Sequence, residues 1–271
     1  MKKKGNNKIK TKKMPCVLFL IFITSIFFLI ACGKKVVDMS NIETVEELSY
    51  DYVSEEDCIV YIEEDGAYVP YLVLTSDYGG NVLLLRKELM AETRPYKENE
   101  SGLWPTYELG SYYEDSDIDF YLNADFIDII DLSVKEYIVD SNIEITDKAS
   151  YNGPDRISTS IIRKVFLLSL EEMAFNGLQH ITVQEGTPLK YFEDDYTRRL
   201  AFLSDGRDFP YWTRTPELWE NYKVVAIGIK KVGSASAHIS NGVRPAFCVK
   251  RSTPVVQSTD VVEGETVFVI E

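Results

Sequence analysis

The chain has 271 residues, of which 45% are hydrophobic and 12% aromatic. This composition excludes a disordered stalk and is sufficient for one large domain or two small ones. The 43 acidic and 29 basic side chains give a formal net charge of −14, which disfavours nucleic-acid binding because an acidic surface repels phosphate backbones.

Residues 1–31 have the pattern of a secretory signal. Seven lysines and no acidic residue precede an apolar run from Met14 to Ala31. A positive head, an apolar stretch and a small residue before a cut site are typical of an exported chain. The end of the run, Leu29-Ile30-Ala31-Cys32, resembles the lipobox of bacterial lipoproteins. The resemblance implies that the Cys32 thiol receives a diacylglycerol, that the signal is removed, and that acyl chains anchor the protein.

An uncleaved anchor helix with an incidental Cys32 is the alternative, since the run is near the lower limit of about 17 residues for a membrane span. Both versions place the later residues on the extracytoplasmic face of the cell membrane. Removal of residues 1–31 would take away seven basic side chains and no acidic one, leaving a formal net charge of −21. That charge disfavours adhesion to anionic lipids, so we expect contact with the membrane through the anchor alone.

The segment after the lipobox is polar. Residues 32–57 are rich in glutamate and aspartate, which predicts an acidic tether or a loosely attached first segment. The folded body is predicted to begin at Cys58. Strand-like runs at 68–74 and 82–85 are joined by a turn whose Gly79 and Gly80 can adopt the positive φ of a tight hairpin.

Helical periodicity begins near Asp115 and continues to about residue 130, with Asp115, Ser116 or Asp117 as candidate caps. Ser169 and Glu172 have the spacing of a capping box and predict a second helix. A third helix is predicted at about 188–203. Further strands are predicted at 137–145, 164–168, 211–215, 222–230, 235–240 and 243–250, and residues 251–271 are predicted to form an edge strand or a tail.

Strands at both ends with helices between them predict an α+β domain with a single mixed or antiparallel sheet and a few helices. Two cysteines remain in this body, Cys58 and Cys248. Export permits a disulfide between them, whereas two buried free thiols are the alternative.

Six segments, in their order, resemble the DUF6273 domain, an uncharacterised bacterial module of surface and secreted proteins. They are Tyr71–Leu74 with Leu83–Leu85, Arg94–Tyr96, Phe120–Phe126, Lys164–Glu172, Tyr211–Pro216 and Asn241–Phe247. The resemblance covers about residues 58–250. The last two segments also resemble the end of C-type-lectin-like and formylglycine-generating-enzyme-like domains. That analogy implies a last strand that returns near the first, with late loops forming a binding surface.

Three residues of those last segments are the candidate ligand-binding residues: Trp212, Arg214 and Arg244. A guanidinium beside an aromatic ring can bind a carboxylate or stack on a sugar. The structural alternative is that each arginine pairs with a buried acidic partner.

Other chemistry has little support in the sequence. The acidic run at 115–119 lacks the glycine and glutamate of a calcium loop, and no paired Cys/His spacing predicts zinc. His180 and His238 are far apart, without a nucleophile motif. We therefore expect no metal, no cofactor and no catalytic residue. Glu193-Asp194-Asp195 is the cluster that a glycosidase could use, although a solvated acidic helix face is the ordinary explanation.

The leading hypothesis is a non-enzymatic, lipid-anchored module that binds an envelope protein or glycan. The alternatives are a carboxylate-dependent hydrolase that acts on cell-envelope polysaccharide, and a scaffold lipoprotein whose partner is another envelope protein.

Overall fold

The computed structural model describes residues 37–98, 110–114, 116–150, 156–175, 184–218, 220–229 and 231–270. The signal-like segment and the predicted lipidation site Cys32 lie outside these residues, as do Asp115 and His180. Contacts divide the chain after Val36, and the residues from Val37 onward form one compact unit. Within the described ranges, no helix has the length and apolar character needed to cross a membrane.

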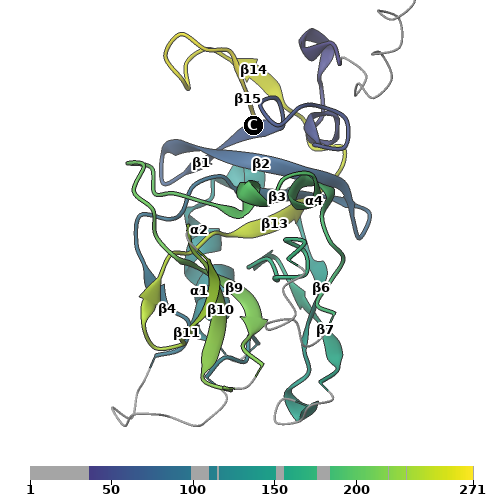
Figure 1. Cartoon of the computed structure of the whole chain (residues 1–271). Helices are drawn as coiled ribbons and strands as arrows, with labels where there is room; N and C mark the ends of the chain where they lie inside the picture. Colours follow the sequence, from purple (N-terminus) through teal and green to yellow (C-terminus); the bar gives the residue numbers. More distant parts are fainter. Residues whose placement is uncertain are drawn as a thin grey trace, which may run out of the picture. The chain divides into compact units, whose positions relative to one another are not determined.

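A mixed eight-stranded sheet organises the fold (Figure 1). Its strands follow the order β14-β15-β1-β2-β3-β13-β5, and β8 also pairs with β13. Neighbours pair antiparallel except β15, which runs parallel to β1. The expected α+β domain with a mixed sheet and few helices is therefore confirmed at that level, whereas the expectation of a single sheet is wrong, because three smaller sheets accompany this one. The strands are β1 (Ile59–Glu64), β2 (Ala67–Tyr78), β3 (Asn81–Arg86), β5 (Ile138–Val139), β8 (Val165–Phe166), β13 (Ala246–Val249), β14 (Val256–Ser258) and β15 (Val267–Val269).

The predicted hairpin is confirmed as β2 and β3, joined at Gly79 and Gly80. Both glycines have positive φ, at 60° and 86°, which is the backbone conformation that a two-residue hairpin turn requires. The apolar residues that predicted the strands, from Tyr71 to Leu74 and from Val82 to Leu85, are buried.

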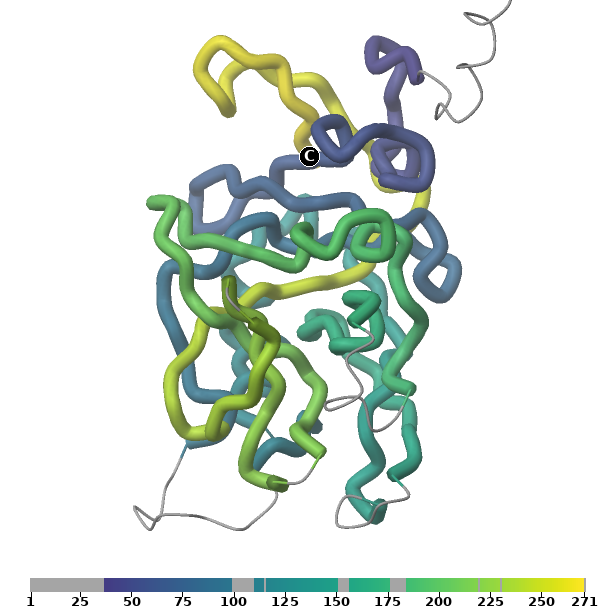
Figure 2. Tube along the Cα trace, viewed as in Figure 1, coloured from purple at the N-terminus to yellow at the C-terminus, as the bar shows by residue number. Residues whose placement is uncertain are grey.

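The predicted acidic tether is wrong for its described part, which begins at Val37. Its 3₁₀ helices η1 (Met39–Asn41) and η2 (Val45–Leu48) contain apolar side chains that the polar average of the segment conceals. Val45 and Leu48 are fully buried, and Thr44 forms a bridge with Pro254 near the C-terminus. The two ends of the folded unit lie side by side, in purple and yellow in Figure 2. The C-terminal segment supplies both the edge strand β14 and the inner strand β15.

The first predicted helix begins where expected, and Ser116 is its cap, accepting a hydrogen bond from the Asp119 backbone N–H at 3.2 Å. It comprises α1 (Asp117–Tyr121), the π-helical turn η3 (Leu122–Phe126) and α2 (Ile127–Ile129), and a separate short helix α3 (Leu132–Lys135) follows. Ile118, Leu122 and Phe126 point into the core.

The helix predicted after Ser169 does not form within residues 169–175. Ser169 and Glu172 do exchange the two hydrogen bonds of a capping box. However, Ala174 adopts a positive φ of 53°, which ends a right-handed helix, so the segment forms turns. The third predicted helix is shorter than expected, as α4 (Lys190–Asp194) followed by η5 (Tyr196–Arg199).

Three smaller sheets complete the unit. A three-stranded sheet has the order β11-β10-β9, and two-stranded sheets join β12 with β4 and β6 with β7. The remaining elements are β4 (Arg94–Pro95), β6 (Ser141–Thr146), η4 (Lys148–Ser150), β7 (Ser158–Arg163), β9 (Tyr211–Pro216), β10 (Lys223–Ile227), β11 (Val232–Ser236) and β12 (Ser240–Asn241).

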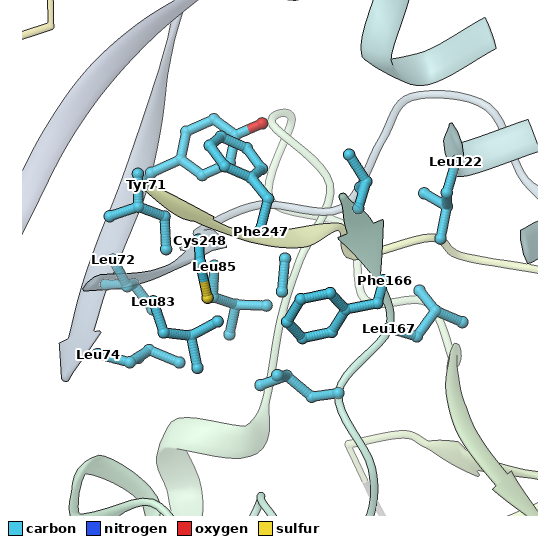
Figure 3. Close-up of a cluster of buried hydrophobic side chains, with 14 of the residues drawn as sticks. Tyr71, Leu72, Leu74, Leu83, Leu85, Leu122, Phe166, Leu167, Phe247 and Cys248 are labelled. Atoms are coloured by element: carbon cyan, nitrogen blue, oxygen red, sulfur yellow. The ribbon is translucent and has the colours of Figure 1, made fainter. Parts of the chain in front are cut away.

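The core packs on both faces of β13. Phe247 and Cys248 point to opposite sides of this strand, with Phe247 beside Tyr71 and Cys248 beside the leucines of β3 (Figure 3). Cys58 and Cys248 are buried free thiols, so the disulfide considered from the sequence is absent. Cys58 precedes β1, and strands β2 and β3 separate it from β13. Three strand spacings are about 14 Å, whereas a disulfide needs Cα atoms within about 7 Å.

Candidate binding cleft

Trp212 lies in β9, where every residue is buried. Its side chain is 1% exposed, and the indole N–H donates to the Arg94 carbonyl at 2.9 Å. The ring also packs edge-on against Tyr96. Trp212 therefore joins β9 to β4 inside the core, and the prediction that it contacts a ligand is wrong.

Arg214 is also enclosed, with 0% exposure. Its guanidinium forms two bonds with the Glu172 carboxylate, at 2.6 and 2.8 Å, and further bonds with the carbonyls of Glu144, Leu167 and Glu185. Tyr78 donates its hydroxyl to the same carboxylate at 2.6 Å. For Arg214 the structural alternative is the correct one, because the pair ties several chain segments together and leaves no group free for a ligand.

Arg244 differs from Arg214 in its partners. It is 3% exposed, and it donates to the carbonyls of Arg86 and Lys87, at 3.0 and 3.2 Å, and to the Tyr211 hydroxyl at 3.4 Å. Among the described residues it forms no ion pair with a carboxylate. The fold thus buries this cation against neutral acceptors.

Arg244 is held in place by elements that are themselves fixed. Arg86, whose carbonyl it contacts, forms a buried ion pair with Glu64 at 3.1 Å. Gly242 packs so closely that an added Cβ would lie 2.9 Å from Leu89, which explains the glycine two residues before the arginine. The Gly-x-Arg-Pro pattern therefore encodes a rigid placement of the guanidinium.

A cleft of about 790 Å³ opens beside Arg244. Its walls come from the segment before β1 with the first residue of β1, from β2, from the two residues after β3, from the region between α4 and Gly206, and from Arg244 before β13. The lining residues are Glu55, Glu56, Ile59, Leu72, Lys87, Glu88, Tyr191, Thr197, Arg198, Leu200, Ala201, Phe202, Leu203, Ser204, Gly206 and Arg244.

The cations of the cleft differ in whether they have an ion-pair partner. Arg198 pairs with Glu55 at 2.7 Å and also donates to the Tyr50 hydroxyl at 2.7 Å. Lys87 is exposed and, like Arg244, forms no ion pair within the described residues. Three cations and three carboxylates line the cleft. It is therefore near neutral in a chain whose net charge is −14, and an anion meets less repulsion there than over most of the surface.

The acidic cluster considered for glycoside hydrolysis has structural partners. Asp194 pairs with Lys190 at 2.5 Å and accepts from Tyr50, while Asp195 caps η5 by accepting from the Thr197 backbone N–H. These hydrogen bonds lower the pKa of both carboxyls. A general acid needs the opposite shift, so the arrangement favours two permanently ionised surface groups.

No group of histidine, cysteine, aspartate or glutamate side chains that could hold a metal occurs among the residues that the structure describes. Burial raises the pKa of the Cys248 thiol to about 12, which keeps the sulfur protonated and unreactive at neutral pH. Of the three ligand-binding residues predicted from the sequence, the structure therefore brings only Arg244 to a cleft.

Lys87, Arg198 and Phe202 were missed by sequence reasoning. They come from separate segments that the fold brings together, and no motif connects them. The Arg198-Arg199 pair was the available signal, because it places two adjacent cations in a chain with a net charge of −14.

Comparison with known proteins gives one family. Its description is "Domain of unknown function (DUF6273)", and it matches residues 79–251. The match begins later than the predicted start at residue 58 and leaves out β1, β2 and the C-terminal strands β14 and β15. No curated protein and no solved structure matches the chain. The match covers more than half of the sequence, and the chain therefore belongs to the DUF6273 family.

Proposed function

We propose that this protein is an extracytoplasmic, lipid-anchored binding module that holds an anionic group of an envelope glycan or protein in the Arg244 cleft. The observation that carries the proposal is the buried Arg244 guanidinium, which lines an open cleft and has no carboxylate partner among the described residues. The ligand class follows from that charge.

Hydrogen-bond geometry supports an anionic ligand. A guanidinium has five N–H donors, and Arg244 uses three of them in the contacts described above. Two donors remain for a ligand, which suits the two oxygens of a carboxylate. Hydrogen bonds to charged groups contribute about 1.5–3 kcal/mol each. A carboxylate in the cleft would also supply the negative charge that Arg244 lacks among its described partners.

The rest of the cleft provides apolar contact area. Ile59, Leu72 and Leu203 line its walls, and the Phe202 ring is 40% exposed at its surface. Exposed aromatic rings give a large contact area at modest entropic cost. This combination fits an acidic sugar or an acidic peptide better than a free inorganic anion.

The proposed location rests on the lipobox resemblance at Cys32 and on the lysine-rich head. A C-type-lectin-like arrangement is also proposed, supported by the return of the last strand β15 to pair with β1. In such an arrangement the cleft would lie among loops that bind a ligand, with the anchor holding the domain near the envelope.

A binding array of acidic and neutral envelope glycans and peptides tests the proposal. Wild-type protein is expected to retain carboxylate-bearing probes, and Arg244→Gln and Lys87→Gln should each reduce their retention at least tenfold. Lys87 is exposed, so its variant keeps the test valid if Arg244→Gln destabilises the fold.

Arg207→Gln is the matched control. Arg207 is 74% exposed, pairs with Asp205 and lies just beyond the lining residues, so its variant removes the same charge without touching the cleft. Equal loss of binding in Arg207→Gln would show that binding depends on the net charge of the protein and not on the residues of the cleft. Binding of neutral probes alone would contradict the proposal, and capture of a protein partner that survives Arg244→Gln would favour the scaffold alternative.

A further inference from the structure

A second hollow lies on one face of the β10–β11 pair, away from the residues that line the Arg244 cleft. Its volume is about 420 Å³. It is lined by Asp208, Pro210, Ala226, Gly228, Ile229, Lys231, Gly233, Ser234, Ala235, Ile239 and Asn241. None of these residues lines the first cleft, so binding in this hollow does not depend on the proposed function.

The floor of the hollow is made of residues with little or no side chain. Ala226 lies opposite Gly233, and Gly228, two residues after Ala226, also lines the hollow. Ala235 continues that face along β11. Neighbouring strands normally cover such a face with β-branched or aromatic side chains, and here the hollow exists because those side chains are missing.

The two glycines are not required by the backbone. Neither Gly228 nor Gly233 has φ in the left-handed region, and an added Cβ at Gly233 would meet nothing closer than the Lys231 Cε atom at 3.7 Å. Glycine weakens a strand interior, and it is typical of sites where a ligand approaches the backbone closely. Space for a ligand is the property that both glycines share.

Asn241 gives the hollow a specific polar group. The residue is 4% exposed, and its Nδ2 has no hydrogen-bond partner among the residues that the structure describes. Native proteins seldom bury a donor in this way, and a ligand acceptor at this position would satisfy it. The amide is held by β12, which pairs with β4 through Arg94.

The surroundings decide the chemistry of the ligand. Ile229 and Ile239 are 42% and 43% exposed beside the hollow, so its sides are apolar. Asp208 and Lys231 are exposed lining residues that can bond to hydroxyl groups. A neutral amide donor in a hollow that Asp208 also lines disfavours a carboxylate and suits a carbonyl that carries a small apolar group.

We propose that this hollow binds the acetamido group of an N-acetylated amino sugar. The methyl group fills the space above Ala226, Gly228 and Gly233. The acetamido carbonyl accepts a hydrogen bond from Asn241 Nδ2, and the acetamido N–H can donate to Asn241 Oδ1. The sugar hydroxyls lie toward Asp208 and Lys231.

Ligand-observed NMR with the full-length chain and N-acetylglucosamine as probe tests this assignment. The probe is expected to show saturable binding, with the strongest saturation transfer on its acetamido methyl group, and glucose should not compete. Asn241→Ala and Gly233→Val should each weaken binding at least tenfold, equivalent to about 1.4 kcal/mol. Asn241→Ala removes an unpaired polar group and Gly233→Val fits the strand, so thermal unfolding should show that both variants fold.

Asn142→Ala, at an exposed asparagine of β6, is the control and should bind as wild type. Glucose binding equal to that of N-acetylglucosamine would overturn the assignment, as would unchanged binding in folded Asn241→Ala. Binding of N-acetyl-alanyl-alanine amide without binding of the sugar would assign the hollow to a peptide and also overturn it.

Discussion

The buried ion pair between Arg214 and Glu172 is predicted to contribute strongly to the stability of the fold. Both side chains are 0% exposed, and the closer of their two hydrogen bonds is 2.6 Å. Glu172→Gln keeps the shape of the side chain but leaves the guanidinium without its counter-charge and turns an amide NH₂ toward its donors. Breaking one partner of a buried pair costs about 3–5 kcal/mol. In a folded unit of this size, that loss lowers the melting temperature by about 6–20 °C.

Urea unfolding of the purified protein, followed by circular dichroism, measures this difference as a shift in the midpoint. Glu220→Gln is the control, since Glu220 forms a partly exposed ion pair with Lys223 of a kind that contributes about 0.2–1 kcal/mol. A loss below about 1 kcal/mol in Glu172→Gln, or equal losses in the two variants, would refute the reasoning that this pair is a buried structural tie.

Three further predictions concern single features of the fold. Gly80→Ala should lower the free energy of unfolding in urea by about 1–2 kcal/mol, because Gly80 has a φ of 86°. No atom of the described residues lies within 4 Å of an added Cβ, so contacts add no further effect. An unchanged midpoint would contradict the positive φ at this turn. Trp212→Phe should lower the free energy of unfolding by about 1–3 kcal/mol, because the hydrogen bond to the Arg94 carbonyl is lost. Binding in the cleft should stay unchanged, and weaker binding would show that Trp212 contributes to the ligand site. Without reductant, Cys58 and Cys248 should both be alkylated after denaturation but not in the native protein, which the intact mass would show. Alkylation of Cys248 in the native protein at pH 8 would contradict its burial.

A related prediction concerns alkaline pH. Burial raises the pKa of the Cys248 thiol from 9.0 to about 12, so the folded state keeps a proton that the unfolded chain releases above pH 9. The resulting stability is fully present below pH 9 and is lost as pH rises toward 12, at about 1.4 kcal/mol per pH unit. Unfolding of the wild type should show this decline, and Cys248→Ala should lack the contribution.

Local signals in the sequence predicted local structure well. The Gly79-Gly80 turn, the apolar runs on either side of it and the Ser116 cap each depend on residues within a few positions, and the structure has all three. The capping box at Ser169 shows the limit of such signals. Its two hydrogen bonds form, but Glu172 is also bound by Arg214, 42 residues away, and the chain turns instead of continuing as a helix.

The binding residues were harder to predict because burial depends on distant contacts. Arg214 and Arg244 have similar sequence surroundings, each near an aromatic residue in a strand-like run. Only the fold shows that Glu172 neutralises the first, whereas the second lines a cleft. The acidic composition of residues 32–57 likewise concealed the apolar side chains of Val45 and Leu48, which pack at helical spacing into the core.

Binding of an anion by Arg244 is tested most directly by NMR. The side-chain Nε–H signal of Arg244 in ¹H–¹⁵N spectra is assigned by its loss in Arg244→Lys and is then followed during titration with galacturonate and with galactose. We expect a saturable shift with galacturonate, a much smaller one with galactose, and at least tenfold weaker binding in Lys87→Gln. An Arg244 signal that does not move with the acidic sugar, or that moves equally with the neutral one, would contradict the assignment of this cleft as an anion-binding site.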